Sequence, residues 1–237
     1  MPNQRSTPES ATYSTQPQAV LWDMDGTLID TEPYWMAGEA NLVAEFGGSW
    51  SSEQAHALVG AALPDAARVL QEAGVKLSVR EIIDSLSAEV IAGIKTKLIW
   101  RPGALELLAK ISAAGIPQAL VTMSERSIVN DFLAQLPGSY FDVTVAGDEV
   151  RAGKPHPEPY LRGIELLSEK FEQRLNPASC VGFEDSLPGI TAASSAGLYA
   201  VLVPNATDPG VGRWRRLESL EHLTLSDLET WLEPINA

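Results

Sequence analysis

Short apolar runs that end abruptly in polar residues recur along this chain, and they constrain its fold more than any other feature. The first run is Ala19-Val20-Leu21-Trp22, which stops at Asp23-Met24-Asp25-Gly26-Thr27. Such a run is typical of a strand that is buried on both faces of a sheet. The same pattern predicts further strands over 118–121, 141–145, 179–183 and 198–203.

Helical patterns separate these runs. Leu105, Leu108 and Ile111 repeat at a spacing of three, and Ser124 is expected to cap the helix that follows it. Residues 157–171 and 224–232 show similar periodicity, the latter with Ser226 as a possible cap. Alternating strands and helices imply right-handed crossovers and a parallel sheet covered on both faces. The predicted fold class is therefore α/β, with a Rossmann-like parallel sheet at its core.

Residues 34–99 break this alternation, because they show helical periodicity and no strand pattern. Ser51 to Gln54 and Ser78 to Glu81 each match a capping box, in which a Ser and a Glu or Gln three residues later pair at a helix start. We predict an all-helical cap domain over 34–99, inserted into an α/β core of 19–33 and 100–237. Ligands bind at the carboxyl edge of a parallel sheet. Since both connections of the insert lie at that edge, the cap can act as a lid.

Composition narrows the range of partners and compartments. Seventeen Lys and Arg against 31 Asp and Glu give a formal net charge of −14, which disfavours nucleic acid polymers and anionic lipids in the absence of a basic patch. No run approaches the ~20 apolar residues of a membrane span, and the polar residues 1–18 lack a signal peptide and are expected to form a disordered tail. The single Cys180 is compatible with a reducing compartment. We expect a cytoplasmic protein that is a monomer or a weak dimer.

Two acidic residues follow the first strand directly. If the strand continues through Asp23, then Asp23 and Asp25 point roughly the same way, because side chains alternate along a strand. Two carboxylates in one small space require a bound cation or a shared proton. A solvated turn after the strand is the simpler reading of the same residues.

A second acidic pair, Glu184-Asp185, follows the strand predicted over 179–183. A parallel sheet gathers its strand ends on one side, so this pair is expected near Asp23 and Asp25. Oxygen ligands of this kind hold magnesium, which typically takes one or two carboxylates together with water and substrate phosphate. The alternative is that Glu184 or Asp185 caps the next helix.

Polar and cationic groups follow two other strands. Thr122 comes directly after the strand predicted over 118–121, and the amides of Met123 and Ser124 at a helix start could bind an anion. Lys154 lies in Gly153-Lys154-Pro155-His156-Pro157, where two prolines restrict the loop. A lysine presented in this way can bind phosphate.

Together and in this order, these motifs resemble those of the haloacid dehalogenase (HAD) superfamily of aspartate-nucleophile phosphohydrolases. The resemblance covers about residues 19–203. It is closest to the beta-phosphoglucomutase-like branch, whose helical cap is inserted directly after the first motif. The motifs that carry it are Asp23-Met24-Asp25-Gly26-Thr27, Thr122, Lys154 within Gly-Lys-Pro, and Glu184-Asp185.

The resemblance implies a role for each motif residue. Asp23 would attack phosphorus and become an aspartyl phosphate, while Asp25 would protonate the leaving oxygen and then activate water. The magnesium ligands would be Asp23, the backbone carbonyl of Asp25, Asp185 and, directly or through water, Glu184. The oxygens of the transferring group would be bound by Thr122, Met123 and Lys154.

Within this branch the cap sequence favours a phosphatase. Beta-phosphoglucomutases carry a histidine ten residues after the second Asp, where this chain has Trp35, and an arginine in a cap loop that here reads Gly60-Ala61-Ala62-Leu63-Pro64-Asp65. Trp35 and Leu63 are candidates to contact the substrate, which we expect to be a small phosphate ester of a sugar or polyol. Packing of Trp35 within the cap core is an equal alternative.

Two other functions remain open at this stage. One is a phosphosugar mutase that uses the same aspartyl phosphate, and the other is a non-catalytic protein that binds a phosphorylated ligand. Asp25 disfavours a dehalogenase or a phosphonatase, which lack an Asp at this position. His56 and His156 are expected to have no catalytic role, and Cys180 is expected to be an inert core residue.

Overall fold

The computed structural model describes residues 16–232, so residues 1–15 and 233–237 lie outside the described part of the chain. Most of the predicted disordered tail falls outside it. The end of that tail is not loose: the backbone amide of Gln18 donates a hydrogen bond to Ser179 O at 2.8 Å, and its side chain accepts one from the Asn176 amide at 2.7 Å.

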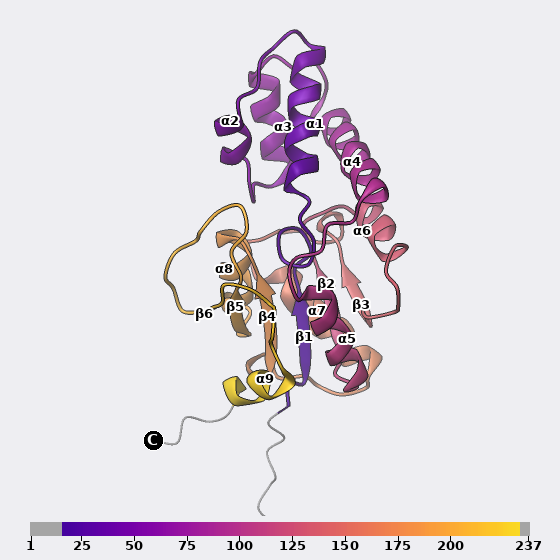
Figure 1. Ribbon diagram of the computed structural model, residues 1–237, viewed down its shortest axis with the longest axis vertical. Helices are drawn as coiled ribbons and strands as arrows, with labels where there is room; N and C mark the ends of the chain where they lie inside the picture. Colours follow the sequence, from indigo (N-terminus) through magenta and orange to yellow (C-terminus); the bar gives the residue numbers. More distant parts are fainter. Residues whose placement is uncertain (1–15, 233–237) are drawn as a thin grey trace, which may run out of the picture.

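A parallel sheet forms the centre of the fold, as predicted (Figure 1). Its strand order is β3-β2-β1-β4-β5-β6, and every neighbouring pair is parallel. The strands are β1 Ala19–Trp22, β2 Gln118–Val121, β3 Val143–Val145, β4 Cys180–Glu184, β5 Tyr199–Leu202 and β6 Arg215–Arg216. The sequence patterns missed β6, because a two-residue edge strand of arginines has no apolar run to reveal it.

Helices cover both faces of the sheet. Alternate residues of β1 face opposite layers: Val20 and Trp22 pack with one cluster, and Ala19 and Leu21 with the other. The first cluster includes helices α5 (Ala104–Ala113), α6 (Arg126–Leu133) and α9 (Leu225–Leu232), and the second includes α7 (Glu158–Lys170) and α8 (Leu187–Ser195). This arrangement confirms the predicted three-layer α/β architecture.

Two expected helix caps were wrong. Helix α6 begins one residue later than expected, with Glu125 at the N-cap position, because the Ser124 hydroxyl hydrogen-bonds to Asp25 instead. Ser226 lies inside α9, and Thr224 takes the capping role by accepting a hydrogen bond from the Asp227 amide at 3.3 Å.

Four helices follow β1 in the chain and precede α5. They are α1 (Glu32–Glu45), α2 (Ser52–Ala57), α3 (Leu63–Glu72) and α4 (Val79–Thr96). The two predicted capping boxes are present, with Ser51 before α2 and Ser78 before α4. Helices α1, α3 and α4 share a separate apolar cluster that includes Leu42, Leu70 and Ile82. We call the four helices the helical insert. The exact division into cap and core remains a prediction.

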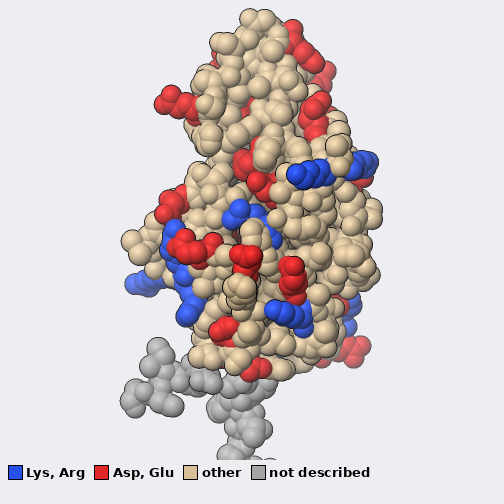
Figure 2. Space-filling view, viewed as in Figure 1, with Lys and Arg blue, Asp and Glu red and all other residues tan. Residues whose placement is uncertain are grey.

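The insert sits over the carboxyl end of the sheet (Figure 1). Two ion pairs join α4 to the beginning and middle of α6: Arg80 to Glu125 at 2.6 Å and Lys95 to Asp131 at 2.7 Å. Figure 2 shows acidic side chains on both the insert and the core, with the two parts meeting above a cluster of charged groups. The insert therefore roofs the edge where the predicted site residues lie.

Candidate active site

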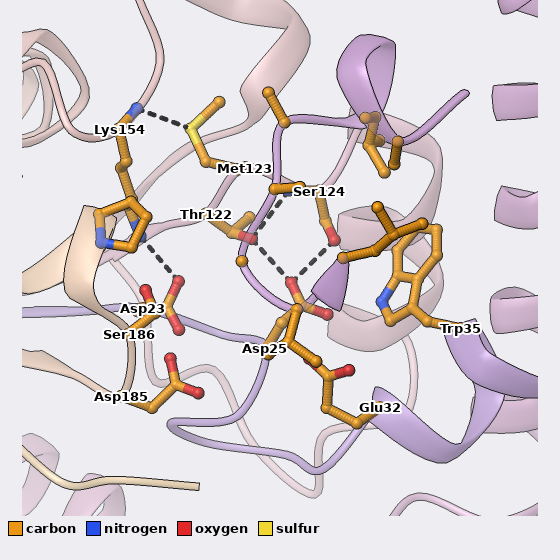
Figure 3. A pocket seen from close by; sticks show the side chains of 18 of the residues that line it. Asp23, Asp25, Glu32, Trp35, Thr122, Met123, Ser124, Lys154, Asp185 and Ser186 are labelled. Atoms are coloured by element: carbon orange, nitrogen blue, oxygen red, sulfur yellow. Dashed lines mark hydrogen bonds and ion pairs between the residues drawn. The ribbon is translucent and has the colours of Figure 1, made fainter. Parts of the chain in front are cut away.

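A cavity lies between the carboxyl ends of β1, β2 and β4 and the helical insert, and its volume including the part open to solvent is about 970 Å³ (Figure 3). It brings together nearly all the predicted site residues. Those that line it are Asp23, Asp25, Trp35, Leu63, Thr122, Met123, Lys154 and Asp185. Glu184 is not among the residues that line the cavity, and it is fully buried.

The loop after β1 presents its two aspartates to this cavity. β1 ends at Trp22, but the Asp23 amide still donates to Phe183 O at 3.0 Å, which extends the pairing with β4 by one residue. Met24, between the two acids, is fully buried in the core. The expected alternation therefore holds, with Asp23 and Asp25 on the cavity side.

Lys154 is a buried cation at the floor of the cavity. Its side chain is only 4% exposed, and its Nζ lies 2.7 Å from Asp23 Oδ1, 2.6 Å from Glu184 Oε1 and 2.9 Å from Val121 O. Burial by itself would lower the pKa of Lys154, but Asp23 and Glu184 hold it above its usual value. Tyr160 Oη also donates to Glu184 Oε1, at 2.6 Å. Lys154 is thus held as a permanent positive charge beside Asp23.

Three carboxylates converge near this lysine, and they fit a divalent cation. One oxygen from each of Asp23, Glu184 and Asp185 lies within 4.8 Å of the others. Asp23 Oδ2 and Glu184 Oε2 are buried and have no hydrogen-bond partner among the described residues. Two glycines, Gly26 and Gly189, leave room for these groups, since a Cβ at either position would overlap the Asp185 or the Glu184 carboxylate.

The electrostatics of the three acids also favour an added positive charge. Burial raises the pKa of Asp23 to about 7, with a further contribution from Glu184 that Lys154 only partly offsets. Burial, reinforced by Asp23, raises the pKa of Asp185 well above its usual range. One lysine does not neutralise three buried carboxylates, and oxygen ligands of this kind suit magnesium. The alternative role of Glu184 or Asp185 as a helix cap was wrong, because Ser186 caps α8 by accepting from the Gly189 amide.

Asp25 is held by three hydroxyl groups. Thr31 Oγ1 donates to its Oδ1 at 2.7 Å. Thr122 Oγ1 and Ser124 Oγ donate to its Oδ2 at 3.0 and 2.8 Å (Figure 3). Sequence reasoning assigned the Ser124 amide to the site, but neither the Ser124 hydroxyl nor Thr31. Thr31 follows the first motif closely and Ser124 lies two residues after Thr122, so proximity to the motifs was the available signal.

The predicted anion site after β2 needs one correction. The Ser124 amide donates to Thr122 Oγ1 at 3.0 Å, so this amide is already bonded within the loop. Helix α6 begins only at Arg126. Of the expected pair of amides, that of Met123 is left as the candidate donor to an anion.

The insert contributes a second wall to the cavity. Trp35 and Leu63 line it as predicted, and Trp35 also packs against the apolar clusters of core and insert. Two further acids line the same wall, Glu32 and Glu39. Their signal in the sequence is helical spacing: Glu32, Trp35 and Glu39 are three and four residues apart, so they share a face of α1.

The remaining polar candidates lie outside this site. His56 Nδ1 contacts Ser52 O at 2.6 Å within the insert, and His156 Nδ1 accepts a hydrogen bond from the Glu158 amide at 3.1 Å. Neither lines the cavity. Cys180 is buried, and burial raises the pKa of its thiol to about 12. A thiol in such a state is an inert core residue.

Known proteins resemble this chain in sequence and in fold. The haloacid dehalogenase-like hydrolase family matches residues 20–203. A probable pseudouridine-5'-phosphatase of Saccharomyces cerevisiae is 31% identical over 91% of this chain and 98% of its own length. A phosphorylated carbohydrates phosphatase of Thermotoga maritima is 32% identical over 78% of this chain and 83% of its own length.

A solved structure shows the same fold. A mutant of CbbY from Rhodobacter sphaeroides, in complex with xylulose-(1,5)bisphosphate, superposes with a TM-score of 0.76 at 26% identity. The match covers 87% of this chain and 96% of the other. Within residues 16–232, the chain has no helix whose length and apolar character would let it cross a membrane.

Proposed function

Because this chain belongs to the haloacid dehalogenase-like hydrolase family, and is a phosphoric monoester hydrolase of that family, we propose that it is a magnesium-dependent phosphatase of a small sugar or polyol phosphate. The observation that carries this proposal is the position of Asp23 between a buried lysine and two further acids. An exposed, solvated turn would show neither the paired lysine nor the unpartnered oxygens.

Magnesium would be held by side-chain oxygens of Asp23, Asp185 and Glu184 and by the backbone carbonyl of Asp25. When bound, the ion offsets the repulsion between an anionic nucleophile and an anionic phosphate. The chemistry of the donors supports this assignment, since all are hard oxygen ligands and the three carboxylates are buried.

In the first step the carboxylate of Asp23 attacks phosphorus. A phosphorus–oxygen bond forms to Asp23, and the bond to the leaving oxygen breaks. Lys154 lies where it can stabilise negative charge on the transferring group, as can the amide of Met123. Asp25, in its protonated form, gives its proton to the leaving oxygen, because a sugar or polyol alkoxide is a poor leaving group without one.

In the second step Asp25, now a carboxylate, takes a proton from a water molecule that attacks the aspartyl phosphate. The bond between Asp23 and phosphorus breaks, and inorganic phosphate leaves. Asp23 is restored as a carboxylate and Asp25 as an acid. Thr31, Thr122 and Ser124 orient Asp25 by donating hydrogen bonds to its carboxylate. Their hydroxyl groups can rotate, so each can also accept a hydrogen bond from Asp25 when that side chain is protonated.

The proposal is tested by phosphate release from an aryl phosphate, with magnesium varied from zero upwards. Turnover that requires magnesium and is lost in Asp23→Asn supports it. Turnover that survives in Asp23→Asn would rule out the covalent step. The absence of turnover with every divalent metal would rule out phosphatase activity. A sugar monophosphate that is converted into its isomer without phosphate release would identify a mutase instead.

A further inference from the structure

The wall that the insert adds to the cavity is acidic and apolar. Glu32 and Glu39 of α1 line it, and Trp35 lies between them on the same helix face. Glu39 is only 5% exposed, and its Oε2 accepts a hydrogen bond from Trp50 Nε1 at 3.0 Å. This contact fixes one oxygen of the carboxylate of a side chain that lines the cavity. The rest of the wall is apolar and includes Leu58, Val59, Leu63, Ala66 and Leu86.

Positive charge is scarce in this cavity. Among the described residues that line it, Lys154 is the single Lys or Arg. Its Nζ is already within 2.7 Å of Asp23 and Glu184 at the floor, on the side away from α1. This single lysine can offset the charge of one phosphate group, the one that is transferred. A second phosphate or a carboxylate on the substrate would reach the wall formed by Glu32 and Glu39. Burial raises the pKa of each of these two acids to about 7, so above this pH both carry a negative charge, and like charges in a desolvated space repel.

Given the phosphatase proposed above, we infer that the leaving group is an uncharged, hydroxyl-bearing one, that Glu39 accepts a hydrogen bond from one of its hydroxyls, and that esters with a second anionic group are excluded. Trp35 and the apolar side chains next to it supply a surface for the carbon side of a sugar or polyol. A hydroxyl donates well to a fixed carboxylate, and such bonds to charged groups are the strong ones.

This inference separates the chain from the CbbY structure with the same fold, which holds a bisphosphate. The difference would reside in the insert, because the floor of the cavity has to bind the transferring phosphate in both kinds of enzyme. Glu39 is therefore a specificity-determining residue for the leaving group, and its carboxylate works in two ways: it binds a hydroxyl and repels an anion.

Matched pairs of substrates test the inference. We would compare hexitol 6-phosphate with hexose 1,6-bisphosphate, and glycerol 3-phosphate with 3-phosphoglycerate, by kcat/KM in the wild-type protein with saturating magnesium, at a pH well above the raised pKa of Glu32 and Glu39, where both are ionised. In each pair, the ester with the uncharged leaving group should have a kcat/KM at least a hundredfold higher than its partner. Equal or faster turnover of the charged members would overturn the inference, whereas loss of all turnover, aryl phosphate included, would overturn the proposed function as well.

Substitution of Glu39 identifies the residue responsible. In Glu39→Gln, the ratio of kcat/KM for hexitol phosphate to that for aryl phosphate should fall tenfold or more, because a charged acceptor is replaced by a neutral one. In Glu39→Lys, the ratio of kcat/KM for esters with an uncharged leaving group to that for esters with a second anionic group should fall tenfold or more. Glu45→Gln, at the exposed end of the same helix, is the matched control and should preserve both ratios. If Glu39→Gln lowers kcat/KM equally for all substrates, Glu39 is structural and the inference fails.

Discussion

Lys154 Nζ and Glu184 Oε1 lie 2.6 Å apart, and both side chains are almost completely removed from solvent. Glu184 belongs to the centre of the sheet, at the end of β4, whereas Lys154 comes from the loop before α7. The pair holds that loop against the sheet and places the lysine beside Asp23, 131 residues earlier in the chain.

The first prediction concerns this pair. Replacement of Lys154 by Met leaves buried carboxylates without a positive partner, so the free energy of unfolding should fall by about 3–5 kcal/mol in metal-free buffer. Turnover should be lost as well. Urea unfolding in the presence of a chelator measures the first effect. Lys76→Met, at an exposed position, should change the unfolding midpoint little; a similar change in both variants would mean that Lys154 does not compensate the acids.

The second prediction concerns metal binding. Magnesium should raise the melting temperature, because it binds the folded acid cluster and not the unfolded chain. At a concentration of 100 times its Kd the gain is about 2.7 kcal/mol, or roughly 5–10 °C for a chain of this size. The same titration of Asp185→Asn should show a much smaller shift. An equal shift in both proteins would place the ion elsewhere.

Gly26 provides the third prediction, since it has a positive φ of 83° and lies against the Asp185 carboxylate. Gly26→Ala should reduce magnesium affinity by at least tenfold, because the new methyl group displaces Asp185. Gly47 has nearly the same φ, 77°, and open space where its Cβ would lie. Gly47→Ala therefore reproduces the backbone strain alone, at a cost of about 1 kcal/mol. Equal magnesium affinities in the two variants would show that Asp185 moves aside freely.

The parts of this fold that the sequence predicted are those with a local sequence pattern. The strand at 19–22 and the two capping boxes of the insert are local patterns, and each appears where it was expected. Ser124 shows the limit of such patterns. It has the residue type and position of a helix cap, but the side chain of Asp25 competes for its hydroxyl, and Asp25 is 99 residues away in the sequence.

The same limit applies to the site. Motif residues at strand ends could be placed together because parallel strands end at one edge of a sheet, whatever the loops do. Glu39 could not, since its place in the cavity depends on how the insert is oriented over the sheet and on a hydrogen bond from Trp50. The spacing along α1 places Glu39 on the same helix face as Trp35, but it encodes neither the orientation of the insert nor this hydrogen bond.

The fourth prediction tests the role of Asp25 as a general acid. In Asp25→Asn, phosphoryl transfer to Asp23 should depend steeply on the leaving group, because no proton is supplied to the departing oxygen. An alkyl phosphate should lose 10²–10⁴-fold in rate, and an activated aryl phosphate much less. The rate of the first turnover, measured by rapid quench, separates this step from the later attack of water. If both esters slow equally, Asp25 does not protonate the leaving group.

The last prediction concerns the pH dependence of stability and rests on Glu39. Burial raises the pKa of Glu39 from 4.5 to about 7, against the opposing hydrogen bond from Trp50. The folded protein therefore holds a proton on Glu39 that the unfolded chain has released between these two values. Stability from this residue is fully present below pH 4.5 and is lost as the pH rises to about 7.

In Glu39→Gln this loss disappears, while the amide oxygen can still accept from Trp50. The free energy of unfolding of the variant, relative to that of the wild type, should therefore be higher at pH 8 than at pH 5 by an amount on the order of 2 kcal/mol. Urea unfolding at both pH values measures the difference, and Glu45→Gln, at an exposed position of the same helix, should run parallel to the wild type. Parallel curves for Glu39→Gln would mean that Glu39 is ionised in the folded protein throughout this range, and that the wall of the cavity is more hydrated than its burial indicates.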